Sequence, residues 1–132
     1  MTHTRTIRAL LVLGLVVLAT GCRKNSNPNA PDSGAPGVSG ATITITSAGV
    51  NPKNVQIAVG QSVTFLNSDS RSHDMTSDPH PSHTQCPSLN AVGVLAPGQS
   101  KLTNAISAAT SCGFHDHGDP DNANLKGTIT IR

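Results

Sequence analysis

The side chains best able to hold a metal ion are concentrated in two polar segments of the sequence. The stretch TSCGFHDHGDPDN, near the C-terminal end, holds three of them: Cys112, His115 and His117. The stretch NSDSRSHDMTSDPHPSHTQCPSLN holds three more histidines: His73, His80 and His83. The whole chain has only three cysteines and six histidines, so these two segments contain most of its soft donor atoms. This distribution indicates a metal site.

The spacing of Cys112 and His115 fits a shared metal ion. A thiolate and an imidazole separated by two intervening residues can reach one ion, because a turn brings their tips together. His73, from the other segment, would complete a set of two imidazoles and one thiolate, the ligation of blue-copper electron-transfer sites. A tetrahedral variant would suit zinc. His117 is open to three roles: a ligand, a residue that orients a ligand, or a surface histidine.

His80 and His83 lie in the proline-punctuated sequence DPHPSHTQ. A solvent-exposed polar loop is the simpler interpretation, and a metal-scavenging loop is the alternative. Long irregular loops in a compact domain are usually functional or disordered, so both interpretations stay open.

The elements that must position these side chains are β-strands. Apolar residues alternate with other residues along five runs: Ile43 and Ile45; Val55, Ile57 and Val59; Val63 and Phe65; Leu102 and Ile106; Ile129 and Ile131. Turn sequences such as NPKN and APGQS separate these runs. The pattern predicts an all-β sandwich in which each strand buries one face. With two phenylalanines, no Trp and no Tyr, the core should be mainly aliphatic.

With these elements in place, the chain resembles the cupredoxin family, in particular its small plastocyanin-like and amicyanin-like domains. GVNPKNVQIAVGQSVTFLNSDSRSHDM is similar to the N-terminal half of that family, LAPGQS to its Pro-Gly turn, and LKGTITI to its closing strand. The resemblance covers residues 41–132 and implies a Greek-key β-sandwich. It further implies one copper ion held by His73, Cys112 and His115, and a protein that carries single electrons rather than an enzyme.

Two positions depart from the family pattern. Leu125 stands where the family commonly has an axial methionine, so the axial ligand would be absent, or supplied by His117, Asp116 or a backbone oxygen. Cys86 is the second departure, because it could form a disulfide with Cys112 in an oxidising compartment.

That disulfide would remove the thiolate and leave a histidine-only, type-2-like copper site. Its candidate donors would be His73, His115 and His117, with His80 or His83 as further ones. The family register favours Cys112 as a ligand but says nothing about Cys86. The thiolate site is therefore the main interpretation and the disulfide its alternative.

Residues 1–21 predict an export signal, with Arg5 and Arg8 before the apolar run Ala9–Ala19. This run is too short for a permanent membrane-spanning helix. The sequence LATGC resembles a bacterial lipobox, so we expect acylation of Cys22, with plain secretion as the alternative.

Residues 22–40 are rich in Pro, Gly, Asn and Ser and predict a disordered tether. Residues 41–132 would then be a copper-binding domain held at a membrane by its lipid anchor, in the periplasm or another extracytoplasmic space.

The charge balance excludes one class of partner. Removing Arg5 and Arg8 from the nine basic residues leaves seven, equal to the seven acidic residues. A nearly neutral domain has no basic patch for nucleic acid. We expect a monomer that meets a redox partner protein. The rival functions are copper storage or delivery, and a small copper enzyme that acts on a reactive oxygen or nitrogen species.

Overall fold

The structure is a computed structural model, and it describes residues 39–132. The predicted export signal, the lipidation site Cys22 and nearly all of the predicted tether lie outside the described residues. Within residues 39–132, no helix is long and apolar enough to cross a membrane.

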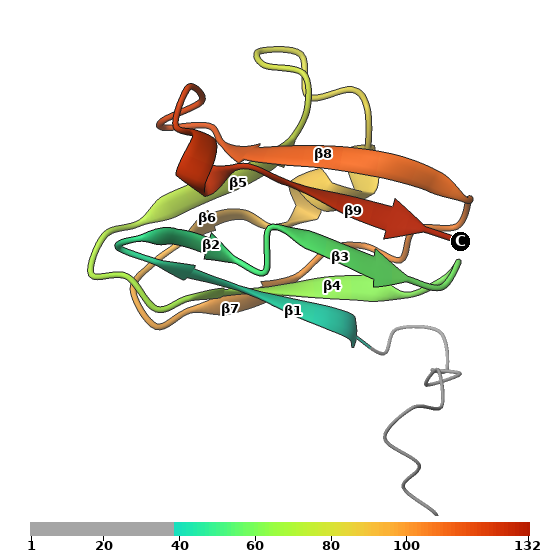
Figure 1. Ribbon diagram of the computed structural model, residues 1–132, viewed down its shortest axis with the longest axis horizontal. Helices are drawn as coiled ribbons and strands as arrows, with labels where there is room; N and C mark the ends of the chain where they lie inside the picture. The colour runs from blue at the N-terminus through green and yellow to red at the C-terminus, as the bar shows by residue number, and fades with distance from the viewer. Residues whose placement is uncertain (1–38) are drawn as a thin grey trace, which may run out of the picture. The chain divides into compact units, whose positions relative to one another are not determined.

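Two β-sheets packed face to face form the described domain, which confirms the predicted all-β sandwich (Figure 1). The first sheet has the order β2-β1-β4-β7, with the bounds Gly49–Asn51, Ser39–Thr46, Ser62–Asn67 and Ser100–Leu102. The second has the order β3-β9-β8-β5-β6, with the bounds Asn54–Ile57, Gly127–Ile131, Thr110–Asp116, His73–Ser77 and Gly93–Leu95. The pairs β1–β4 and β3–β9 are parallel, and the other pairs are antiparallel.

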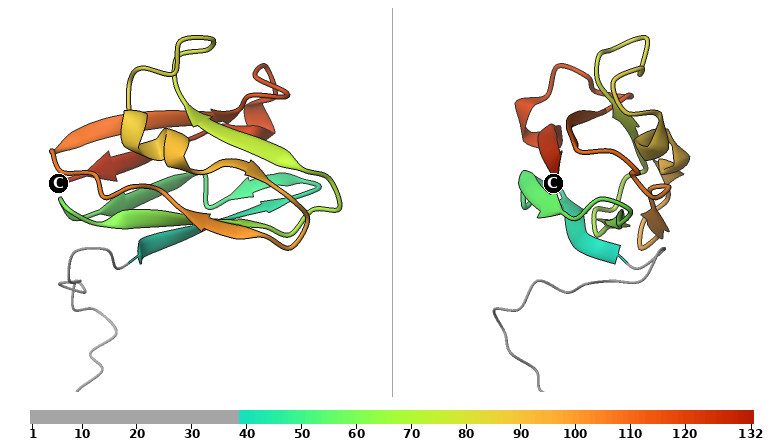
Figure 2. Two further views of the ribbon diagram at one scale, coloured as in Figure 1. Left: turned by 180° about the vertical axis from the view of Figure 1, so that it is seen from behind. Right: turned by 90° about the vertical axis from the view of Figure 1, so that its right-hand side faces the viewer.

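Two short 3-10 helices interrupt the connections between strands: η1 (Pro87–Ala91) and η2 (Ala123–Leu125). Residues 78–86 join β5 to η1, and residues 117–122 join β8 to η2. Both connections project from the same part of the molecule, above the second sheet (Figures 1 and 2). The two histidine-containing segments are thereby placed beside each other.

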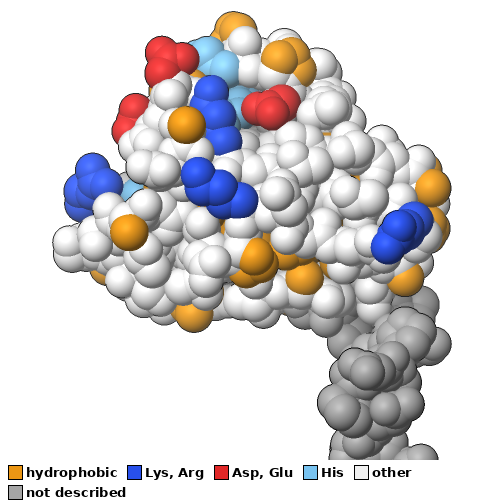
Figure 3. Space-filling model, viewed as in Figure 1, with side chains coloured by type: hydrophobic (Ala, Val, Ile, Leu, Met, Phe, Trp, Pro, Cys, Tyr) orange, Lys and Arg blue, Asp and Glu red, His pale blue; other side chains and the backbone are white. Residues whose placement is uncertain are grey.

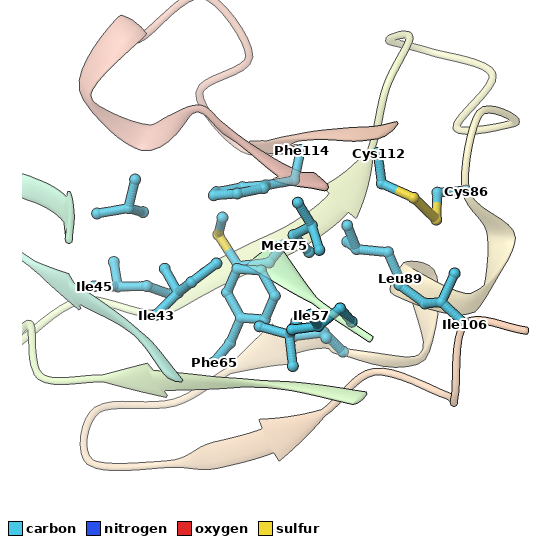
Figure 4. Close-up of a cluster of buried hydrophobic side chains, with 14 of the residues drawn as sticks. Ile43, Ile45, Ile57, Phe65, Met75, Cys86, Leu89, Ile106, Cys112 and Phe114 are labelled. Carbon is cyan, nitrogen blue, oxygen red and sulfur yellow. A yellow bond between two sulfur atoms is a disulfide. The ribbon is translucent and has the colours of Figure 1, made fainter. Parts of the chain in front are cut away.

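The core lies between the sheets and is largely aliphatic, as predicted (Figure 4). Its two aromatic rings, Phe65 of β4 and Phe114 of β8, meet edge to face with ring centroids 5.2 Å apart. Such an arrangement brings the positive edge of one ring to the negative face of the other. Fully buried aliphatic side chains surround the rings, among them Ile43, Ile45, Val63, Leu89, Leu95 and Ile129.

Two apolar positions in the predicted alternation are exposed. Val59 is 47% exposed because it lies in the turn after β3, and Leu102 is 46% exposed at the end of the edge strand β7. The alternating pattern therefore located β1, β3, β4, β7 and β9, but it continued past the ends of β3 and β7, and Ile106 is buried from the connection that follows β7.

Strand β8 continues well beyond Cys112 and ends only at Asp116. Successive side chains of a strand point to opposite faces of the sheet. Cys112 and Phe114 point into the core (Figure 4), so His115, three residues after Cys112, lies on the outer face of the second sheet. The turn expected directly after Cys112 is not formed, and this sets the arrangement of the metal-binding side chains.

Candidate metal centre

Four histidines converge on the outer face of the second sheet: His80, His83, His115 and His117. One ring nitrogen from each lies within 4.8 Å of those of the other three. Imidazole nitrogens at such separations can reach a common ion, since a metal–nitrogen bond is about 2.0–2.1 Å long.

Strand β8 and the loop of residues 78–86 supply two histidines each. His115 is the penultimate residue of β8 and His117 follows its end, so the two have the same parity and share a face. The loop folds back over this face and covers His115, which is only 1% exposed. His80 and His83 are brought down onto the strand in this way.

Hydrogen bonds to β8 hold the loop in place. The Asp78 N–H donates to the Gly113 carbonyl at 3.0 Å, and the Gly113 N–H donates to the side-chain oxygen of Gln85 at 2.9 Å. A Cβ at Gly113 would collide with the Asp78 carboxylate and would crowd Gln85, so the absence of a side chain there lets the loop approach the strand. The GFHDH sequence thus combines a contact point for the loop with two imidazoles.

The orientation of two rings is set by their Nδ1 atoms. His83 Nδ1 lies 2.9 Å from the Ser77 carbonyl oxygen, which can only accept, so this nitrogen carries the proton. His115 Nδ1 lies 2.6 Å from the Asp78 carboxylate. Both contacts leave Nε2 as the remaining donor atom: that of His83 faces His117, and that of His115 lies 3.4 Å from Thr76 Oγ1. Metal-binding histidines commonly have such partners on their other nitrogen.

His117 contributes its other nitrogen, Nδ1, which lies 3.0 Å from His83 Nε2. The His117 backbone N–H donates to the Asp74 carbonyl at 2.7 Å, which fixes the chain where it leaves β8. Two ring nitrogens that face each other at this distance could share one proton, or a cation could take its place.

His83 has a backbone φ of 50°, in the left-handed region that non-glycine residues rarely occupy. Its carbonyl accepts hydrogen bonds from Ser77 Oγ and Asn90 Nδ2, both at 2.9 Å. Asn90 Oδ1 also accepts from the Ser77 N–H. This network stabilises a conformation that is otherwise unfavourable, which is a feature that clusters at functional sites.

The surroundings of His80 favour its neutral ring. Desolvation lowers the pKa of His80 below its usual value, and repulsion from the three neighbouring imidazoles lowers it further. The ring centroids of His80 and His117 lie only 5.1 Å apart. Because a metal ion binds the unprotonated nitrogen, the lowered pKa of His80 also favours metal binding by this ring.

The expected thiolate ligand requires a correction, because Cys112 is joined to Cys86 in a disulfide, with Cα atoms 5.6 Å apart (Figure 4). The sulfur has no free thiolate and faces the core. The sequence left this disulfide open as the alternative, and the structure contains it.

His73 also lies away from the cluster. Its Nδ1 is 2.7 Å from the Asp116 carboxylate and its Nε2 is 3.1 Å from that of Asp69, so both nitrogens are engaged. Leu125, the expected axial position, lines a cavity of about 220 Å³ together with His73 and Asp116. The predicted set of His73, Cys112 and His115 is therefore not brought together.

The pKa of Asp69 is lowered, and the His73 contact contributes to this. Burial acts to raise the pKa of this carboxyl. The hydrogen bonds from His73 and from the Ser70 N–H outweigh that effect, with help from the nearby Arg71 charge. The carboxylate, the imidazole and Asp116 thus form a buried polar chain, and within residues 39–132 no buried side-chain nitrogen or oxygen lacks a partner.

The sequence signal for the observed cluster was the H-x-H pattern at His115 and His117. Two histidines with the same parity on a strand share a face, whereas Cys112 and His115 have opposite parity. His80 and His83, interpreted as surface residues first and as a metal loop second, belong to the group. The chemistry of the donor set fits a transition metal ion, since imidazoles suit copper, zinc, iron and nickel.

Comparisons with solved structures agree on the fold. A purple cupredoxin from Nitrosopumilus maritimus aligns with a TM-score of 0.54 and 20% identity over 70% of this chain and 99% of its own. The oxidized plastocyanin of Dryopteris crassirhizoma aligns with a TM-score of 0.54 and 19% identity over 69% and 99%. A Cu(I) form of a mutant amicyanin aligns with a TM-score of 0.54 and 14% identity over 74% of this chain and 83% of its own. No family model and no curated protein sequence matches. Residues 39–132 therefore have a cupredoxin-like fold.

Proposed function

We propose that this protein binds one copper ion outside the cytoplasm through a histidine-only site. The observation that carries the proposal is the convergence of four imidazole nitrogens within 4.8 Å, from His80, His83, His115 and His117. The solved cupredoxins with the same fold include a Cu(I) form of amicyanin, which supports copper over other ions. Copper(II) also binds imidazole sites more tightly than the other common divalent ions.

The location outside the cytoplasm is supported by the disulfide, since such bonds persist in oxidising compartments. It agrees with the predicted export signal. We further propose that acylation of Cys22 holds the domain at a membrane. The mature, monomeric protein would then meet its redox partner protein or copper-accepting protein there.

The site differs from the thiolate electron carrier expected from the family resemblance. Its ligands would be neutral nitrogens alone, so copper bound there would supply one-electron redox chemistry without a thiolate-to-metal charge-transfer band. The histidine-only alternative therefore has the stronger support, and single-electron transfer stays one of its candidate uses alongside copper storage or delivery.

Copper titration of the isolated, disulfide-intact protein tests this proposal. We expect one copper ion per chain by calorimetry, and a pale Cu(II) form with the wide EPR hyperfine splitting of nitrogen ligation. His83→Ala and His115→Ala should each weaken binding by about tenfold or more. Ser82→Ala, an exposed change in the same loop, should leave it unchanged.

Two results would overturn the proposal. One is copper affinity that does not change in either histidine variant. The other is an intense blue band with narrow hyperfine splitting in the unreduced protein, because that would require a thiolate ligand.

A further inference from the structure

Three of the four imidazoles are held by hydrogen bonds, and the fourth is not. His83 and His115 are fixed through their Nδ1 atoms, and His117 through its backbone N–H and its contact with His83. The ring of His80 makes no hydrogen bond to any residue within the described range. Its contacts are the rings of its neighbours, with centroids 5.1–5.6 Å away.

The least constrained imidazole also borders a cavity. A hollow of about 530 Å³ lies beside the cluster, lined by Asp78, Pro79, His80, His115, Pro120, Asp121 and Lys126. Two of the four candidate ligands, His80 and His115, form part of its wall. An ion at the cluster would therefore be approached from this side, past His80.

The net charge of the cavity changes from negative to positive when a divalent ion is present. Asp78 and Asp121 contribute two negative charges and Lys126 one positive charge. The two positive charges of a divalent ion offset the two carboxylates. The charge of Lys126 then makes the net charge of the cavity positive. Among residues 39–132, no hydrogen bond or ion pair engages the Lys126 amine, so it is available to a ligand. Figure 3 shows histidine atoms reaching the surface at the top of the molecule, between acidic and basic side chains.

We propose that His80 is a displaceable ligand of the metal ion, which His83, His115 and His117 continue to hold. A small inorganic monovalent anion enters through the cavity and binds the metal ion in place of His80. The positive charge of Lys126 attracts this anion. This inference rests on the proposed copper site and assigns it a ligand class. Metal sites that bind exogenous ligands commonly have three protein donors and one exchangeable position, whereas closed four-ligand sites are structural.

Titration of the copper-loaded, disulfide-intact protein with sodium azide tests the inference, followed by EPR and visible absorption. The wild type should bind one azide with saturation. Lys126→Met should weaken that affinity by about three- to tenfold, and raising the salt concentration should shrink the difference. Lys126→Arg should retain the wild-type affinity.

Two matched variants complete the test. Lys101→Met removes the same charge from β7, in the other sheet, and should leave azide affinity unchanged. His80→Ala should still bind one copper ion and should bind azide at least as tightly as the wild type, because the displaced ligand is already gone.

Copper binding without an azide response would overturn this inference and leave the proposed function standing. The same holds if Lys126→Met and Lys101→Met behave alike, or if His80→Ala loses copper as completely as His115→Ala. Failure of the wild type to bind copper would overturn both proposals.

Discussion

Asp78 is the residue that connects the loop, the strand and the orientation of His115. Its backbone N–H binds the Gly113 carbonyl, and its carboxylate lies 2.6 Å from His115 Nδ1. A carboxylate on the far nitrogen fixes the ring and makes Nε2 a better donor. The function of His115 as a ligand should therefore depend on a residue that is 37 positions away in the sequence.

Asp78→Asn tests this dependence. The amide keeps a hydrogen-bonding oxygen but loses the charge, so copper affinity should fall by about tenfold or more. Competition with a chelator of known affinity would measure it. Asp119→Asn, outside the histidine cluster, is the control and should bind as the wild type does. Equal affinities for both variants would contradict the role of Asp78.

Asp69 gives the residue-scale prediction for pH. Its folded-state pKa is lowered, so this carboxylate stabilises the fold above the unfolded pKa of about 3.8. This stabilisation should decrease once the pH falls below the unfolded pKa. It should be lost when the pH has also passed the lower pKa of the folded state. Urea unfolding of the copper-free protein between about pH 5 and pH 2 should show a shallower acid dependence in Asp69→Asn. An equally steep loss in that variant would contradict the prediction, and Asp121→Asn serves as the exposed control.

At the scale of elements, period-two patterning could be followed from sequence to structure for most strands. The alternation at Ile43 and Ile45, and at Ile129 and Ile131, predicted buried strand faces that the structure confirms. The candidate site was predicted less well, because the parity of a ligand depends on where its strand ends. If β8 ended at Cys112, a turn could bring Cys112 and His115 to the same metal ion. Because β8 ends at Asp116, the two side chains lie on opposite faces of the sheet and cannot share an ion. The apolar pattern alone does not locate that end, because Gly113 and Phe114 fit either a strand or a turn.

Cys86→Ala tests the strand-parity argument directly. It removes the cross-link across 26 residues and should lower the free energy of unfolding by about 3 kcal/mol. It also frees the Cys112 thiol, which faces the core, on the side of β8 opposite His115. The copper-loaded variant should therefore remain pale, without a thiolate-to-copper band. A blue product would show that β8 can end at Cys112, as expected from the family resemblance.

At the scale of the whole molecule, copper should join two parts of the sandwich that are distant in sequence. The four histidines come from the loop after β5 and from the end of β8, and the disulfide joins the same two segments. An ion that binds only when these segments are together stabilises the folded state by mass action.

Copper should therefore raise the unfolding temperature of the intact protein. At free copper about a hundred times the dissociation constant, the gain is about 2.7 kcal/mol. For a domain of this size that corresponds to roughly 10–20 °C. Calorimetric scans with chelator-buffered copper would measure the shift, which excess chelator should reverse. His83→Ala, whose dissociation constant is expected to be about tenfold higher or more, should gain about 1.4 kcal/mol or less, and Ser82→Ala should gain as much as the wild type. If His83→Ala gained as much stability as the wild type, copper would be binding elsewhere, because that variant lacks an imidazole through which the loop is joined to the strand.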